Sequence, residues 1–234
     1  MAYSDALDLV FARRGWLSRQ SQVSRRLVLE RGRRVAFDPG DHIVHMGDDA
    51  GGIYGIISGG VGTIGMTRIT GPALGHIMRE GTWFGQGPLL TKGPRSMTFR
   101  AMEETELILV PLQELKPLMA ANVGFAEMIA QMTEYAGRMS ATAVRELLIR
   151  DAPRRLAATL LRVTAVLDGV VSASAQGFRI SQTELAEMAC VSRNYTNRIL
   201  SDLQARGLVT LSYNHIRIEK PETLATYVRE GEDY

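Results

Sequence analysis

Residues 180–218 read ISQTELAEMACVSRNYTNRILSDLQARGLVTLSYNHIRI, and the C-terminal architecture follows from this stretch. Ser181 is followed three residues later by Glu184. This spacing is typical of a capping box, in which each side chain bonds the backbone of the other residue. The pair therefore predicts a short helix over Gln182–Met188.

A second helix is predicted after the turn Ala189–Val191. Ser192 is placed to cap its first turn, and Gly207 is typical of the residue that follows a helix end. These signals predict a helix over Arg193–Arg206. Its inner positions repeat with helical spacing at Tyr195 or Thr196, Ile199, Leu200 and Leu203.

Two short runs rich in branched residues follow, Leu208–Leu211 and His215–Ile218, and residues 212–214 join them. The runs predict a β-hairpin. Helix, turn, capped helix and hairpin together predict a winged helix-turn-helix. Its second helix is the candidate for entering the major groove of DNA.

The exposed positions at the start of this second helix are polar and basic. Arginine pairs bidentately with guanine and asparagine with adenine, and each contact contributes about 1–3 kcal/mol of discrimination. The candidate DNA-binding residues are Arg193, Asn194, Asn197 and Arg198 for the bases, with Gln182, Ser181 and Ser192 at the helix starts, where phosphate is held. The alternative is a winged helix that contacts protein, with its arginines as solvated charge.

Residues 125–150 contain one glycine and no proline, and they predict an amphipathic helix of about seven turns. One apolar row is able to pack on its own domain while the other meets a twin helix, so we predict a parallel homodimer. The alternative is a core helix within one chain. The rows are Phe125, Met128, Met132, Tyr135, Met139, Ala143 and Glu146 or Leu147, and Ile129, Ala136, Val144 and Leu148.

Short branched runs alternate with Gly, Pro and Asp turns between Arg33 and Val110, which predicts a compact antiparallel β-roll. Asp151 and Pro153 predict the start of another helix, over residues 154–167. The chain is thus predicted to be an α+β protein: an N-terminal β-roll over 1–118, a dimerisation helix over 119–150 and a winged helix-turn-helix over 151–234. The strand-like pieces are Ile53–Ile57, Val61–Thr67, Leu74–Met78 and Leu107–Val110.

Composition excludes several other classes. No apolar run approaches the ~20 residues of a membrane span, and the first residues lack the pattern of a secretory signal, so the cytoplasm is expected. The net charge of +2 requires any DNA-binding charge to be local. The single cysteine, Cys190, excludes a four-cysteine zinc site and a self-ligated iron–sulfur cluster, and we expect it to be a small buried residue of the turn. No catalytic constellation or metal spacing is found, so an enzyme is not expected.

The chain resembles bacterial transcription regulators of the Crp/Fnr type, the cyclic-AMP receptor protein superfamily, from about Arg26 to Val228. The resemblance implies a cyclic-nucleotide-binding-like β-roll that senses an effector. It also implies a homodimer that reads a palindromic operator on double-stranded DNA and activates or represses transcription beside RNA polymerase. The motifs that carry it are PGDHIVHMGD (39–48), IYGIISGGV (53–61), GTWFGQGPLL (81–90), PRSMTFRA (94–101) and SRNYTNRIL (192–200).

The resemblance also implies an effector site in the roll. In ligand-binding relatives a glutamate binds the ribose and an Arg-Ser pair clasps the cyclic phosphate; Arg95 and Ser96 match that pair, but Gln86 replaces the glutamate. An amide accepts without charge assistance, so we expect a different effector, or none, rather than cyclic AMP or cyclic GMP. The candidate effector-binding residues are Gly85, Gln86, Arg95, Ser96, Ser140 and Thr142; His42, His45 and His76 are weaker candidates for haem iron.

A cyclic-nucleotide-responsive signalling module whose C-terminal part contacts protein is the alternative function. The argument against it is the polar face formed by Arg193, Asn194 and Arg198. This combination of side chains matches what base recognition requires, whereas a protein-contact surface does not require it. The structural alternatives in the roll are a salt bridge from Arg95 to an acidic loop residue and a turn hydrogen bond from Ser96.

Overall fold

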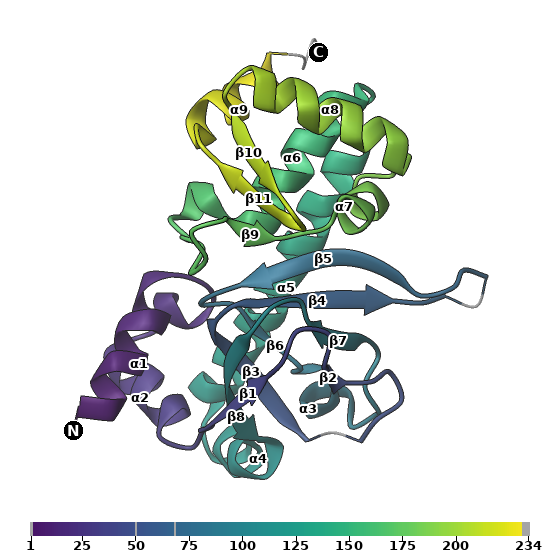
Figure 1. Cartoon of the computed structure of the whole chain (residues 1–234). Helices are drawn as coiled ribbons and strands as arrows, with labels where there is room; N and C mark the ends of the chain where they lie inside the picture. The colour runs from purple at the N-terminus through teal and green to yellow at the C-terminus, as the bar shows by residue number, and fades with distance from the viewer. Residues whose placement is uncertain (1, 50, 68, 231–234) are drawn as a thin grey trace. The chain divides into compact units, whose positions relative to one another are not determined.

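The computed structural model describes residues 2–49, 51–67 and 69–230. The chain divides into two compact units. The first contains the residues up to 65 together with residues 78–139, and the second contains residues 66–77 together with the residues from 140 onward. Figure 1 colours both along the chain.

Two four-stranded antiparallel sheets form the roll and confirm the predicted β architecture. Within the first sheet, Ile53 lies opposite Val110 and Ile56 opposite Leu107. The first sheet has the order β1 (Arg33–Phe37), β8 (Thr105–Pro111), β3 (Gly52–Ser58) and β6 (Trp83–Phe84); the second has the order β2 (His42–Val44), β7 (Thr98–Ala101), β4 (Gly60–Gly65) and β5 (Ala73–Arg79).

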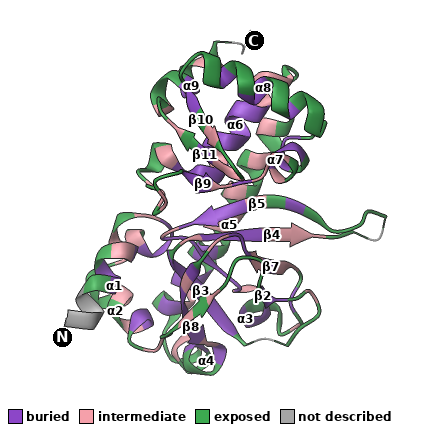
Figure 2. Cartoon of the chain, in the orientation of Figure 1, coloured by how far each residue is buried: buried purple, intermediate pink, exposed green. Residues whose placement is uncertain are grey.

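The interior of the roll is apolar and aromatic. Phe84 lies between Tyr54 and Phe99, with ring centroids 5.2 Å and 4.5 Å away. Figure 2 shows β3 as mostly buried. This interior fixes the loop after β6, where the candidate effector residues begin. The buried cluster contains Ile43, Val44, Tyr54, Ile56, Val61, Met78, Phe84, Phe99 and Leu107.

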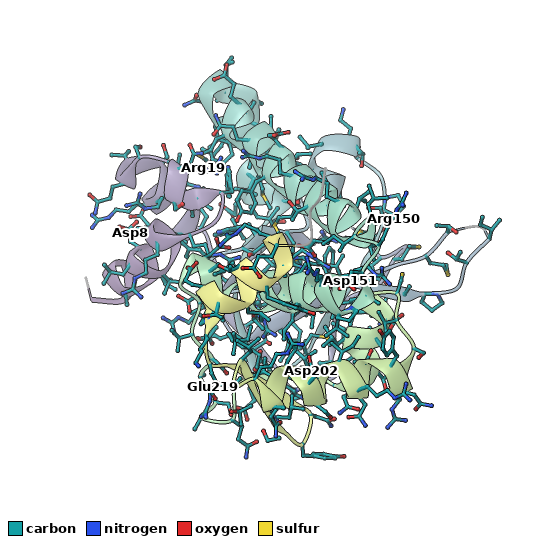
Figure 3. The ribbon with its side chains drawn as sticks, turned by 90° about the horizontal axis from the view of Figure 1, so that it is seen from above. Asp8, Arg19, Arg150, Asp151, Asp202 and Glu219 are labelled. Atoms are coloured by element: carbon teal, nitrogen blue, oxygen red, sulfur yellow. The ribbon has the colours of Figure 1, made fainter. Side chains whose placement is uncertain are left out.

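Helices precede the roll, and these helices were not predicted from the sequence. Trp16 packs edge-on against Trp83 at 5.7 Å, and its indole nitrogen donates to the Met128 carbonyl at 2.7 Å. Asp8, labelled in Figure 3, accepts a hydrogen bond from Arg25, and this bond holds the pKa of the Asp8 carboxyl below its ordinary value. The elements are α1 (Ala2–Arg13), the 3-10 turn η1 (Leu17–Arg19) and α2 (Gln22–Leu29).

The predicted long helix is present as α5 (Val123–Leu147), which starts two residues before the predicted start and ends three before the predicted end. Its buried residues, Phe125, Met128, Ile129 and Met132, join the cluster that also holds Trp16 and Trp83, so part of the predicted row packs within its own chain. Two short helices precede it: α3 (Gly87–Thr91) and α4 (Leu112–Ala121).

The second unit contains the predicted winged helix-turn-helix (Figure 1). Its first helix ends at Thr164 and not at residue 167, because Ala165 adopts a left-handed conformation with φ 53°. A three-stranded sheet has the order β10-β11-β9. The elements are α6 (Ala152–Thr164), the 3-10 turn η2 (Val166–Asp168), β9 (Phe178–Arg179), α7 (Gln182–Met188), α8 (Arg193–Ala205), β10 (Val209–Ser212), β11 (His215–Ile218) and α9 (Pro221–Arg229).

Candidate nucleic-acid interface and effector pocket

Both helices of the motif begin at a capped residue, as the sequence predicts. The Ser181 hydroxyl accepts from the Glu184 backbone N–H at 3.2 Å, and the Glu184 carboxylate accepts from the Ser181 backbone N–H at 2.9 Å. Ser192 accepts from the Tyr195 backbone N–H at 3.3 Å. These bonds fix the ends of α7 and α8, from which the candidate reader residues project.

The turn between α7 and α8 contains Cys190, which the structure places at the surface and not in the buried position expected from the sequence. The reason is the backbone: Cys190 adopts φ 50°, and its neighbour Ala189 takes the buried place instead. The Val191 N–H then bonds the Ala186 carbonyl at 3.0 Å and closes the turn.

One guanidinium from α6 ties this turn to the chain that follows α5. Arg155 Nε donates to the Ala189 carbonyl at 2.8 Å, and its Nη1 donates to the Ile149 carbonyl at 2.6 Å. A third, longer contact of 3.4 Å joins Arg155 to the Cys190 carbonyl. The turn and residues 149–150 are therefore anchored to the same side chain.

A Cys190→Gly variant is expected to be more stable than the wild type by about 0.5–1 kcal/mol, because glycine relieves the left-handed strain and loses part of that gain to chain entropy. Thermal unfolding measures it. Cys190→Ala is the matched control, since alanine removes the thiol and keeps the strain. Equal stabilisation by both substitutions contradicts the backbone explanation.

The start of α8 presents an exposed polar face. Arg193, Asn194, Asn197 and Arg198 are all exposed, and Figure 2 shows the outer side of α8 largely in the exposed colour. Neither arginine forms an ion pair with another described residue. By contrast, Arg206 near the other end of the helix pairs with Asp202 at 2.9 Å; Asp202 is labelled in Figure 3. Positive charge is thus available at the helix start and neutralised towards its end.

Tyr195 is a further exposed residue on this face, with 41% of its surface accessible, while Thr196 is fully buried. Either residue was a candidate for the inner row. Spacing contains the signal that separates them: Thr196, Ile199, Leu200 and Leu203 follow the i, i+3, i+4, i+7 pattern of a buried helix face.

A groove of about 250 Å³ runs between the start of α7, the start of α8 and the wing. Gln182 on its wall donates from Nε2 to the Asn197 Oδ1 at 3.2 Å, so two candidate DNA-binding residues are in contact. Tyr213 at the wing turn is 89% exposed. The residues that line the groove are Ile180, Ser181, Gln182, Thr183, Arg193, Leu200, Leu211, Ser212, Tyr213, Asn214, His215 and Ile216.

Of the candidate effector residues, Gly85, Gln86 and Arg95 lie in the first unit, where Arg95 bonds the Gly85 backbone. Arg95 is 2% exposed; its two terminal nitrogens donate to the Gly85 and Gly52 carbonyls, each at 2.6 Å. The guanidinium also lies 5.8 Å from the centre of the Tyr54 ring. Burial lowers the pKa of Arg95. Backbone carbonyls therefore hold Arg95, and not the salt bridge to an acidic loop residue that was the structural alternative.

These residues fit a cyclic nucleotide only in part. Arg95 Nε is buried without a hydrogen-bond partner among the described residues, and such a donor suits a phosphate oxygen. The other two nitrogens of Arg95 already donate to the backbone. Gln86, the residue directly before α3, carries an uncharged amide that accepts from a ribose hydroxyl without charge assistance. Ser96 is exposed beside the pocket, and Ser140 and Thr142 are exposed on α5 in the second unit.

The structure brings together a group of charged residues that the sequence analysis missed. Arg162 of α6 donates to Glu146 at 2.6 Å and to His76 Nδ1 at 2.7 Å, and only 8% and 14% of the Arg162 and Glu146 side chains are accessible. Burial raises the pKa of Glu146, and the attraction of Arg162 opposes that rise. Because a guanidinium only donates, His76 accepts at Nδ1 in its neutral form.

Residues 66–77 contact the helix-turn-helix in a second place. The Glu187 carboxylate of α7 accepts from the Leu74 backbone N–H at 3.0 Å. No sequence signal marks either contact, because the partners are far apart in the chain.

None of the described helices is long and apolar enough to cross a membrane. Over the same part of the chain, no group of three or more histidine, cysteine, aspartate or glutamate side chains is placed to hold a metal ion.

The fold and its exposed reader helix define a class of protein in which one chain carries a cyclic-nucleotide-binding type of roll and a DNA-binding helix-turn-helix. Residues 34–122 match the cyclic nucleotide-binding domain family, and residues 154–227 match the Crp-like helix-turn-helix domain family. Together the two matches span more than half of the chain. The chain therefore belongs to the Crp/Fnr superfamily and is a DNA-binding transcription regulator.

Known relatives agree with this assignment. The chain is 26% identical over 198 residues to the CRP-like cAMP-activated global transcriptional regulator of Mycobacterium tuberculosis, which covers 83% of this chain and 88% of that protein. It is 21% identical over 169 residues to the cAMP-activated global transcriptional regulator CRP of Escherichia coli O157:H7, over 72% of this chain and 80% of that protein.

Solved structures share the fold. FixK2 from Bradyrhizobium japonicum has a TM-score of 0.67 at 20% identity, over 83% of this chain and 96% of FixK2. The c-di-GMP responsive global regulator CLP from Xanthomonas campestris has a TM-score of 0.62 at 22% identity, over 85% of this chain and 99% of CLP.

Proposed function

We propose that a homodimer of this chain reads a palindromic operator through the start of α8, with Arg193 and Arg198 as the principal base contacts. The observation that carries the proposal is that both arginines are exposed at a capped helix start and have no ion-pair partner among the described residues. Guanidinium groups in that state are able to donate two parallel bonds to guanine O6 and N7. Asn194, Asn197 and the helix starts supply the remaining contacts.

The exposed side of α5 supports the dimer. Ala130, Thr133 and Gly137 are exposed there with spacings of three and four residues, beside the buried cluster. Small residues at this spacing allow two helix backbones to approach closely, and dimers are typical of the family. A two-fold dimer presents two reader helices to successive major grooves, which makes the operator palindromic. Transcription is then controlled beside RNA polymerase in the cytoplasm.

Cyclic AMP is expected to change operator affinity by less than about twofold, because a ligand that does not favour one state of the protein shifts no equilibrium. The reason lies in the pocket, where Arg95 is held by two backbone carbonyls and residue 86 is an amide. Fluorescence anisotropy with the selected operator, with and without saturating cyclic AMP or cyclic GMP, measures the effect. A large rise in affinity with either nucleotide contradicts it.

The experiment that tests the function is selection of binding sites from a random DNA pool by the purified full-length protein, followed by anisotropy titration at moderate salt. An inverted repeat with half-sites one helical turn apart is expected. Failure to prefer any sequence favours the rival function, in which the C-terminal part contacts protein. A single-subunit mass at working concentration contradicts the dimer.

A further inference from the structure

The start of α7 touches the reader helix at one polar contact. Gln182, the first residue of α7, is half-buried and donates to Asn197 of α8, fifteen residues away in the chain, at 3.2 Å. The capping bonds of Ser181 and Ser192 hold both helix starts, so the two amides meet between anchored backbones. This contact ties a residue expected to hold phosphate to a residue expected to read a base.

The bond changes what Asn197 is able to offer to DNA. An asparagine that reads adenine uses both ends of its amide, accepting from N6 and donating to N7. The Asn197 oxygen already accepts from Gln182, which leaves the Nδ2 donor as its outward group. A lone donor pairs with an acceptor in the major groove, which guanine (O6 and N7), thymine (O4) and adenine (N7) present and cytosine does not.

We propose that Gln182 is a positioning residue that turns the amide of Asn197, and that it thereby sets the base preference at one position of each half-site against cytosine, which presents no acceptor in the major groove. This inference rests on the proposed function, since it assumes that α8 reads the operator. Gln182 then acts through Asn197 rather than mainly through phosphate: one of its two N–H groups is already engaged, and its oxygen repels phosphate oxygens.

The test is site selection with the full-length wild type, Gln182→Ala, Asn197→Ala and the double variant. The Asn197→Ala profile identifies the base position. At that position Gln182→Ala is expected to lower the ratio of best to worst base by about fivefold, since the amide is then free to turn and accept from the cytosine amino group. The double variant is expected to match Asn197→Ala there, because coupled residues are not additive.

Gln182→Glu provides a sharper variant. A carboxylate accepts but does not donate, so it binds Asn197 Nδ2 and turns the Asn197 oxygen outward. The preferred base is then expected to change to cytosine or adenine, whose exocyclic amino groups donate in the major groove, along with a general loss of affinity from the added negative charge. Ser201→Ala, at an exposed position of α8 that does not line the groove, is the matched control and should leave the base preference unchanged.

Two outcomes overturn the inference. In the first, Gln182→Ala weakens binding to all sequences equally and keeps the wild-type base preference. In the second, the loss of base preference in the double variant equals the sum of the losses in the two single variants. Thermal melts of every variant establish that the domain is folded. Failure of the proposed function is distinct, because then the wild type itself selects no sequence.

Discussion

Arg193→Ala and Arg198→Ala are each expected to lower affinity for the selected operator by at least ~30-fold while leaving affinity for unrelated DNA much less changed. A bidentate arginine–guanine contact contributes about 1–3 kcal/mol, and a dimer loses two such contacts, which gives about 2–6 kcal/mol. Both side chains are exposed, so the substitutions should not unfold the domain. Anisotropy with the operator and with a scrambled duplex measures the two affinities.

Arg206→Ala is the matched control for charge. Arg206 lies near the end of α8 and already pairs with Asp202, and an exposed pair of this kind is worth only about 0–1 kcal/mol. Its removal should leave base preference unchanged. If Arg193→Ala or Arg198→Ala instead reduces affinity equally on every sequence, that arginine contacts phosphate and the proposed assignment is wrong for it.

Arg162→Met is expected to destabilise the second unit by about 3–5 kcal/mol, the usual cost of leaving a buried charge without its partner. The variant leaves Glu146, with 14% of its side chain accessible, beside an apolar group. It also removes the donor to His76. Denaturant unfolding followed by far-UV circular dichroism measures the loss. The double variant Arg162→Met/Glu146→Leu should recover much of it, because it removes both charges together.

The pH dependence of this variant has a definite sign. Burial raises the folded-state pKa of Glu146, and loss of Arg162 raises it further. A carboxyl whose folded pKa is raised contributes most to stability when protonated, below its unfolded pKa, and that contribution is lost as pH rises through the folded value. The difference in free energy of unfolding between the wild type and Arg162→Met should therefore become smaller as pH falls from 7 towards ~5. A gap that widens contradicts the assignment.

The helix-turn-helix could be predicted closely because its signals are local. Ser181 with Glu184, and Ser192, are capping residues that mark where the two helices begin. As a result α7 has the predicted bounds, and α8 ends one residue before the predicted end. The β-hairpin is equally local. The fold class follows from the same kind of signal, since turn residues punctuate the roll at regular intervals.

Other features depend on tertiary packing and could not be predicted. The N-terminal helices are stabilised by rings that arrive from elsewhere, such as Trp83 against Trp16. The Glu146–Arg162–His76 group joins three distant segments, and no spacing rule connects them. Cys190 is at the surface because of a left-handed backbone that sequence reveals reliably only when glycine is present.

The candidate effector site could be predicted from the sequence only in part. The sequence motif correctly drew attention to Arg95, but it carries no information on which atoms the guanidinium contacts. In the structure two peptide carbonyls, at Gly52 and Gly85, take two of the five N–H donors of the guanidinium. The substitution of an amide at residue 86 is visible in the sequence, whereas this internal occupation of Arg95 is visible only in three dimensions.

Arg155 has a mechanical consequence for the regulator. The Arg155 side chain donates to the carbonyls of both Ile149 and Ala189. The segment that follows α5 and the turn before α8 are therefore held together by one residue. A displacement of residues 149–150 is therefore expected to carry this turn with it, because the same guanidinium bonds both segments.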